Sequence, residues 1–217
     1  MVAGGNWNPR PTALRRLAWE IDKRTSIDVR IEPAAMRIAD PELFRHPFLY
    51  LAGARDFAAP EDAEVARLRR HLSFGGFLLV DSAEARVGGG FDRSVRALAT
   101  RLFPKSPLAK VPEGHVIYKS FYLLGKPAGR TLAQGHLEAI IHDGRALLVY
   151  CQNDLGGAFA RDNLGQWEYE CHPGGEAQRE RAFRLGINLA MYALCLEYKS
   201  DQVHVPFILK RRKWKSR

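Results

Sequence analysis

The chain has 217 residues, of which 46% are hydrophobic and 26% are charged, as is typical of a globular domain with a sizeable core. Its three cysteines, Cys151, Cys171 and Cys195, are odd in number and lack C-x-x-C spacing, which argues against a disulfide framework or a zinc knuckle. No apolar run approaches the roughly 20 residues of a membrane span, and no signal peptide is visible.

The formal net charge is +9, and much of it lies in residues 210–217. Two interpretations of this tail remain open, a solvated end of the chain or an electrostatic anchor for an anionic lipid surface or nucleic acid. Trp214 favours the lipid surface, because an amphipathic ring prefers a membrane interface. No aromatic-basic stripe accompanies the tail, so we expect no specific nucleic-acid binding. The basic side chains that would contact an anionic surface are Lys210, Arg211, Arg212, Lys213 and Lys215.

Helical and strand patterns alternate along the chain, which predicts an α/β domain with a mostly parallel sheet. The first half predicts helices over 11–24, 60–72 and 91–102, and strands over 27–31, 47–52 and 77–80. The second half predicts strands over 117–124, 137–142 and 146–150, an Asp-Gly hairpin turn at 142–145, and a long helix over 176–198.

Three of these strands are apolar throughout, as strands covered on both faces should be. They end at Gly53, at Asp81 and at Asn153-Asp154. In open α/β sheets, ligands bind outside the carboxyl ends of the strands. We therefore expect a site at these three ends.

Several segments, taken together in this order, resemble a known family. They are Gly4–Pro9, His46–Gly53, Leu68–Leu72, Gly75–Asp81, Arg184–Asn188 and Lys199–Ile208. The resemblance is to a bacterial family known only as a domain of unknown function, placed in the class I glutamine-amidotransferase-like superfamily and distantly related to trehalose-utilisation-type proteins.

The resemblance implies a three-layer flavodoxin-like fold with helices on both faces of the sheet. It also implies export or attachment to the cell envelope, whereas the sequence as it stands lacks a signal and is compatible with the cytoplasm. Members usually carry a strand before the Gly-Gly-x-Trp segment, and here only three residues precede it, so we expect a first strand to be missing. The expected organisation is one domain over 1–209, followed by the basic tail 210–217.

A class I glutaminase needs a cysteine on a tight turn after a strand, with a histidine and a carboxylate to activate it. Here Asp81-Ser82-Ala83-Glu84 follows the Gly-Gly strand, and no cysteine is near. Ser82 does not lie in a G-x-S-x-G turn. The sequence therefore predicts that the domain is not a cysteine-dependent glutaminase.

Asp81 and Asp154 are the leading candidates for chemistry, as general base, ligand for a divalent cation, or acceptor for a sugar hydroxyl. The structural alternatives are that Asp81 caps the turn at Ala83 or Glu84 and that Asp154 opens an Asx-turn. His115 and Glu176 are further catalytic candidates, each with a structural alternative. We expect ligand contacts from Gly53, Asp81, Ser82, Asn153, Asp154, Glu176 and Arg179.

Three functions remain open. The favoured one is a non-enzymatic module that binds a small molecule, a carbohydrate or a protein partner in an envelope-associated system, without a cofactor. The second is a hydrolase or metal-assisted enzyme that acts on carbohydrate through Asp81 and Asp154. The third is an adaptor that binds anionic lipid or nucleic acid through its basic tail.

Overall fold

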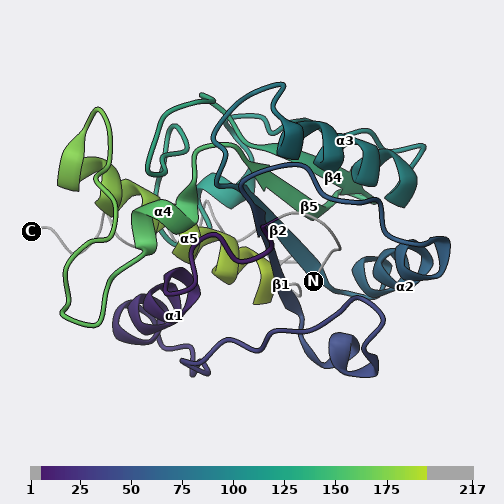
Figure 1. The fold of residues 1–217 in the computed structure, drawn as a ribbon, viewed down its shortest axis with the longest axis horizontal. Coiled ribbons are helices and arrows are strands. Elements are labelled where there is room, and N and C mark those ends of the chain that lie inside the picture. Colours follow the sequence, from purple (N-terminus) through teal and green to yellow (C-terminus); the bar gives the residue numbers. More distant parts are fainter. Residues whose placement is uncertain (1–5, 195–217) are drawn as a thin grey trace, which may run out of the picture.

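The computed structural model describes residues 6–194, and its centre is a five-stranded mixed sheet in the order β1-β2-β5-β4-β3. The strands β1, β2 and β5 run parallel to one another, β4 is antiparallel to β5, and β3 is antiparallel to β4. Figure 1 shows the sheet edge-on between its helices. The strand bounds are β1 Phe48–Gly53, β2 Phe77–Ser82, β3 Ala109–Lys110, β4 Glu138–His142 and β5 Arg145–Cys151.

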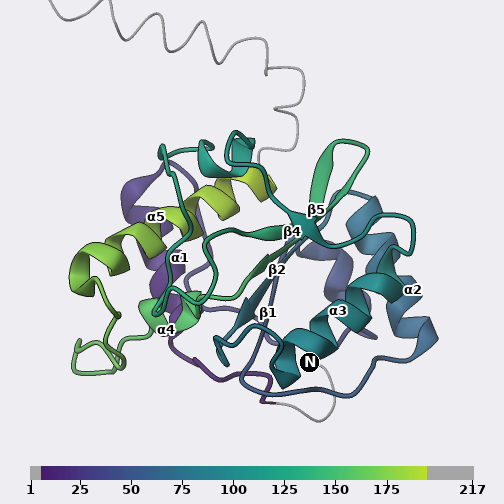
Figure 2. The ribbon, with the colours of Figure 1, turned by 90° about the horizontal axis from the view of Figure 1, so that it is seen from above.

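Helices cover both faces of the sheet (Figure 2). On one face lie α2 (Asp62–Ser73) and α3 (Gly90–Leu102), and on the other lie α1 (Ala13–Arg24), α4 (Leu155–Phe159) and α5 (Gly175–Leu194). Short 3-10 helices span Pro41–Arg45 and Val116–Tyr118. The structure thus confirms an α/β domain with a sheet that is parallel at its centre, while the flavodoxin-like assignment stays a prediction.

The strand β2 shows why the core has two halves. All six of its residues are buried, and their side chains alternate between the two faces. Phe77 and Leu79 belong to the core under α1, α4 and α5, whereas Leu78 and Val80 belong to the core under α2 and α3. Any polar residue near the end of this strand is therefore assigned to a face by its position in the alternation.

Most of the predicted elements are confirmed within a few residues. The three apolar strands form β1, β2 and β5, and the predicted helices form α1, α2, α3 and α5. The Asp143-Gly144 turn joins β4 to β5, with φ of 50° and 71° at its two central residues, as a two-residue hairpin requires. The last residues of the predicted helix 176–198, the tail 210–217 and its basic side chains lie outside the described residues.

Two predicted strands are wrong. Residues 27–31 alternate as a strand would, but they form irregular chain, in which Ile27 and Val29 pack against the core without joining the sheet. Residues 117–124 begin in a 3-10 helix and continue as a loop, because the Asn188 side chain bonds their backbone. It accepts from the amides of Phe121 and Tyr122 at 3.2 and 2.7 Å and donates to the carbonyls of Ile117 and Tyr122.

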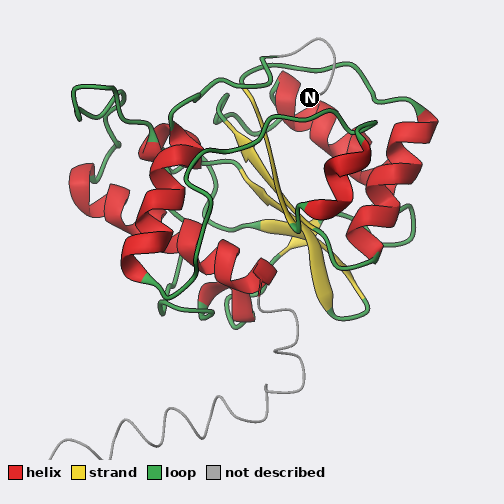
Figure 3. Ribbon diagram, turned by 90° about the horizontal axis from the view of Figure 1, so that it is seen from below, coloured by secondary structure: helices red, strands yellow, loops and turns green. Residues whose placement is uncertain are grey.

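The short helix α4 was not predicted, and it directly follows β5. Figure 2 shows it beside α1 and α5, and Figure 3 shows helices on both sides of the strands. All five of its residues are buried, and two of them are glycines, which weaken a helical pattern in sequence. Of the helices over 6–194, none is long and apolar enough to cross a membrane.

Candidate functional site

The carboxyl ends of β2 and β5 carry polar side chains on both faces of the sheet. Asp81 pairs in register with Cys151, and both side chains point to the α4 face. Ser82, one residue further, points to the α3 face, as do Tyr150 and Gln152 through the same alternation. We predicted from the sequence that Asp81 and Ser82 share one site, but their side chains lie on opposite faces of the sheet.

On the α4 face, Asp81 is fully buried and holds the first turn of α4. Its carboxylate accepts hydrogen bonds from the backbone amides of Leu155 and Gly156, at 2.8 and 2.7 Å, and from the hydroxyl of Tyr50 at 2.8 Å. The predicted alternative that Asp81 caps Ala83 or Glu84 is therefore wrong about the partner, although the capping role itself is present.

Asp154 is also fully buried and is held from three directions. Arg10 donates to its two oxygens at 3.1 and 2.7 Å, the Nε of Arg130 donates to Oδ2, and the amide of Gly157 donates to Oδ1 at 2.9 Å. The backbone of Asp154 is left-handed, with φ of 54°, a conformation that Asp tolerates better than most residues. The predicted opening of a turn at Asp154 is present, as the N-terminal cap of α4.

The two glycines of α4 permit this close arrangement. A Cβ atom at Gly156 would lie 2.7 Å from the Tyr50 hydroxyl, and one at Gly157 would overlap the Asp154 carboxylate. We call this group of Arg10, Tyr50, Asp81, Arg130 and Asp154 the α4-side cluster. Both of its carboxylates are engaged by backbone amides and side chains, so the cluster links the N-terminal segment and the 130 loop to the sheet.

Burial governs the ionisation of the α4-side cluster. It raises the pKa of Asp81 to about 7, with a further contribution from the charge of Asp154, while the three donated hydrogen bonds act in the opposite direction. Burial also raises the pKa of Cys151, which lies beside Asp81, and that of Cys171. A thiol with a raised pKa is a poor nucleophile, so neither cysteine is activated.

The remaining predicted ligand contacts near this face have structural partners. Asn153 is buried, and its side chain forms two hydrogen bonds with the backbone of Gln134. On the opposite, α3 face, Gly53 lies under the ring of Phe91, which a Cβ atom would overlap. These residues fix the loops around the strand ends.

The side chains of the first turn of α5 contact α4 and the loop that follows it. Arg179 is buried and donates to the carbonyls of Ala158 and Tyr169, at 2.7 and 2.8 Å. Glu176 is exposed and pairs with Arg179 at 3.0 Å. Arg179 therefore joins α4, α5 and the loop between them.

His115 has a local role. Its Nδ1 accepts a hydrogen bond from the amide of Ile117 at 3.2 Å, at the start of the 3-10 helix, and its ring lies 5.9 Å from that of Tyr192. Burial lowers its pKa. These contacts match the structural alternative for this histidine.

On the α3 face, a second group of polar side chains lies at the same strand ends. Arg96 donates to both carboxylate oxygens of Glu138, at 3.0 and 2.8 Å, and its Nε lies 3.0 Å from Asp92. The side-chain amide of Gln152 donates to Glu138 at 3.0 Å. We call these residues, together with the neighbouring Ser82 and Tyr150, the α3-side cluster.

This second cluster contains buried polar atoms that make no hydrogen bond of ordinary geometry with the described residues. They are Gln152 Oε1 and the Tyr150 hydroxyl, whose polar neighbours are Ser82 and Asp92. Asp92 Oδ1 makes no hydrogen bond either, but it is ion-paired with the Nε of Arg96 at 3.0 Å. The side chains of Gln152, Tyr150 and Asp92 are only 1 to 2% exposed. Burial and the charge of Asp92 raise the pKa of Tyr150, so its hydroxyl stays protonated. Sequence reasoning missed the cluster, although the Asp92–Arg96 spacing of four residues is a helical ion-pair signal.

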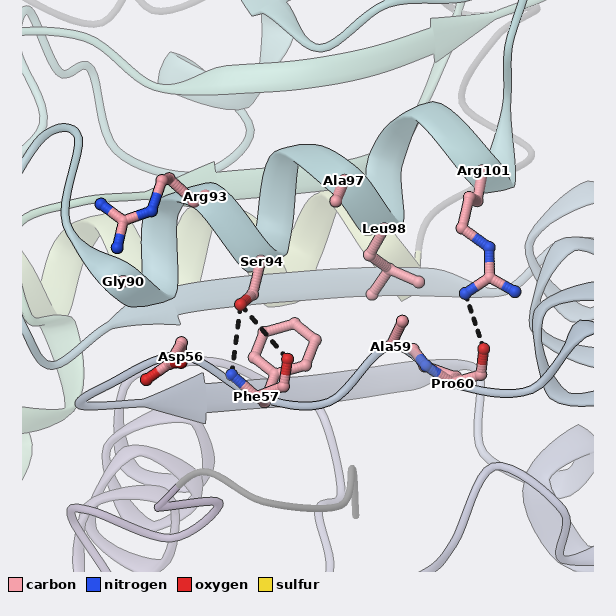
Figure 4. Close-up of a pocket in the computed structure, with 10 residues that line it drawn as sticks. All are labelled: Asp56, Phe57, Ala59, Pro60, Gly90, Arg93, Ser94, Ala97, Leu98 and Arg101. Atoms are coloured by element: carbon pink, nitrogen blue, oxygen red, sulfur yellow. Dashed lines mark hydrogen bonds between the residues drawn. The ribbon is translucent and has the colours of Figure 1, made fainter.

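A groove of about 260 Å³ lies along the other flank of α3 (Figure 4). The hydroxyl of Ser94 bonds the amide and the carbonyl of Phe57 at 3.2 and 3.3 Å, and Arg101 donates to the carbonyl of Pro60 at 2.6 Å. These contacts attach the 56–60 segment to the helix. The groove is open, and these polar groups of its lining are already paired.

The donor set for a metal ion is poor in this part of the chain. Over residues 6–194, no three His, Cys, Asp or Glu side chains are placed so that they could hold one. Asp81 and Asp154 are two carboxylates whose oxygens face amide, hydroxyl and guanidinium donors.

Comparison with known proteins gives a family. No match was found among curated proteins. Residues 2–194 match the family described as Domain of unknown function (DUF4159), which covers most of the chain. The chain therefore belongs to this family.

Proposed function

We propose that this domain is a non-enzymatic ligand-binding module, with an amidotransferase-like fold and a place in an envelope-associated system, and that it binds its ligand at the α3-side cluster. The observation that carries the proposal is a pair of buried side-chain groups, Gln152 Oε1 and the Tyr150 hydroxyl, that make no hydrogen bond of ordinary geometry with the described residues. Buried polar groups in folded proteins are almost always hydrogen-bonded, so exceptions at one place need an explanation. Their position at the carboxyl ends of parallel strands is where α/β sheets bind ligands.

The contacts of Asp81 and Asp154, together with the pKa values of Cys151 and Cys171, support binding over catalysis. Asp81 and Asp154 each accept at least three hydrogen bonds from the protein. Cys151 and Cys171 have raised pKa values. A carboxylate that binds backbone amides and side chains of the fold is less available to a substrate or a cation, which favours binding over the hydrolase alternative.

The test combines a binding screen with an activity screen on the full chain. Isotope-labelled protein is titrated with fragments that carry cationic, anionic or polyol groups, and amide signals are followed by NMR. We expect shifts at residues 92–96 and 150–152, and no turnover of ester or glycoside substrates. Turnover that Asp81→Asn or Asp154→Asn abolishes in a folded variant would refute the proposal, as would a complete lack of fragment binding at the α3-side cluster.

A further inference from the structure

We infer that the α3-side cluster binds a primary ammonium group. The inference rests on the proposed function and names the chemical class of the ligand. It follows from the formal charge of the cluster, from the kind of unpartnered atoms it contains, and from the side chain that lies between the cluster and solvent.

The formal charge of the cluster is negative. Asp92 and Glu138 contribute two negative charges and Arg96 contributes one positive charge, so the sum is −1. Asp92 is 2% exposed and Glu138 is 9% exposed, so water screens these charges less than it would at the surface. A buried charge without full compensation favours a ligand of opposite sign.

The unpartnered atoms include acceptors of hydrogen bonds. Gln152 directs its amide nitrogen to the Glu138 carboxylate, which can only accept, so the orientation of the amide is fixed and Oε1 is the free atom. The oxygen of Tyr150 can accept as well. Asp92 Oδ1 is ion-paired with the Nε of Arg96 at 3.0 Å, and the Asp92 carboxylate adds negative charge close to Tyr150. An ammonium group has three donors and no acceptor, which matches this set.

Arg96 lies between the cluster and solvent. Its side chain is 41% exposed, while its guanidinium pairs with both acids of the cluster. It extends from α3, and a long flexible side chain can change rotamer without a change in the helix. In this proposal, a change of the Arg96 rotamer opens the path by which a small cation reaches Gln152 and Tyr150.

The experiment compares three probes of similar shape on the full chain. Butylammonium has charge and donors, butyltrimethylammonium has charge without donors, and 1-butanol has a donor without charge. We expect butylammonium to shift the side-chain amide signal of Gln152 in a saturable way, with an affinity at least about tenfold above those of the other two probes. Equal binding of all three, or a preference for butanol, would overturn the inference.

Two variants locate the site. Tyr150→Phe removes only the hydroxyl and should weaken butylammonium binding about tenfold, whereas Tyr118→Phe, which has a paired hydroxyl, should leave it unchanged. Gln152→Leu should abolish binding; if that variant does not fold, Tyr150→Phe decides alone. Unchanged affinity in Tyr150→Phe refutes the inference. Fragments that bind the cluster without an ammonium group refute it too, but leave the proposed function intact; no fragment binding refutes both.

Discussion

The α4-side and α3-side clusters occupy the same edge of the sheet but differ in how completely their polar atoms are paired. On the α4 face, Asp81 and Asp154 are surrounded by amide, hydroxyl and guanidinium donors. On the α3 face, Gln152 and Tyr150 have buried atoms without such partners. Because the two faces share the strands β2 and β5, the backbone cannot explain the difference. It comes from which helix begins there.

The helix α4 begins directly at the ends of β2 and β5 and brings its free amides to the two carboxylates. The helix α3 begins instead beside Glu84, whose carboxylate accepts from the amides of Gly90 and Phe91 at 3.2 and 2.8 Å. The first amides of α3 are therefore capped by another residue, and they leave the α3-side cluster to its own side chains. A carboxylate at a strand end thus has a structural role when the first backbone amides of a helix donate hydrogen bonds to it.

The comparison predicts its largest effect at Asp154. Asp154→Asn removes the charge that two guanidinium groups share inside the protein, while it keeps a side chain that can cap Gly157. We expect a loss of about 3 kcal/mol in the free energy of unfolding, because breaking a buried ion pair leaves the other charges uncompensated. Urea unfolding followed by circular dichroism measures it.

The matched control is Asp62→Asn, since Asp62 pairs with Arg101 at the surface. Exposed pairs contribute little, so the control should unfold at almost the wild-type urea concentration. If both variants lose the same free energy of unfolding, the buried ion pairs of Asp154 do not stabilise the fold more than a surface pair does.

A smaller, pH-dependent effect is expected at Asp81. Its pKa is raised to about 7 in the folded state, from an ordinary value near 3.8. At a pH between these two values, Asp81 is mostly protonated in the folded chain and mostly ionised in the unfolded chain. The stability from this group is therefore fully present below about pH 4 and is lost as the pH rises toward 7.

The pH effect is isolated by comparison with Asp81→Asn, which cannot titrate at this position. Wild type should gain about 2 kcal/mol relative to the variant when the pH falls from 7.5 to 5.5. Urea unfolding of both proteins at the two pH values measures the difference. A constant difference, or a gain in the opposite direction, would show that Asp81 stays ionised when folded and that its hydrogen bonds outweigh its burial.

The strand ends were predictable from sequence, but their chemistry was not. Apolar runs that end at Gly53, Asp81 and Asn153 locate the edge of the sheet, because burial on both faces leaves a continuous pattern. Whether Asp81 is free depends on the amides of Leu155 and Gly156, which lie 74 and 75 residues further along the chain. No local pattern contains that contact.

The α3-side cluster could have been found in part. Tyr150 lies in β5 and Gln152 directly follows it, so strand alternation places both on one face, and Asp92 and Arg96 have helical spacing. The meeting of Glu138 with Arg96 requires β4 to pair with β5 and α3 to cross that face, which only the tertiary structure supplies. The wrong strand over 117–124 has the same cause, since Asn188 takes its backbone bonds from 66 or more residues away.

The smallest expected change in the free energy of unfolding comes from removing a buried tyrosine hydroxyl, and Tyr118 and Tyr150 allow a direct comparison. Tyr118 and Tyr150 are each 1% exposed, but of the two hydroxyls only that of Tyr118 forms a hydrogen bond of ordinary geometry, with the amide of Leu137 at 3.1 Å. Tyr118→Phe should cost about 1 kcal/mol or more, because it leaves that amide unpaired. Tyr150→Phe should change the free energy of unfolding by less than about 0.5 kcal/mol, or stabilise the protein, because no bond of ordinary geometry is lost. A loss in Tyr150→Phe equal to that in Tyr118→Phe would mean that its hydroxyl is paired in solution with Ser82 or Asp92, its polar neighbours, and that the two clusters are equally committed to the fold.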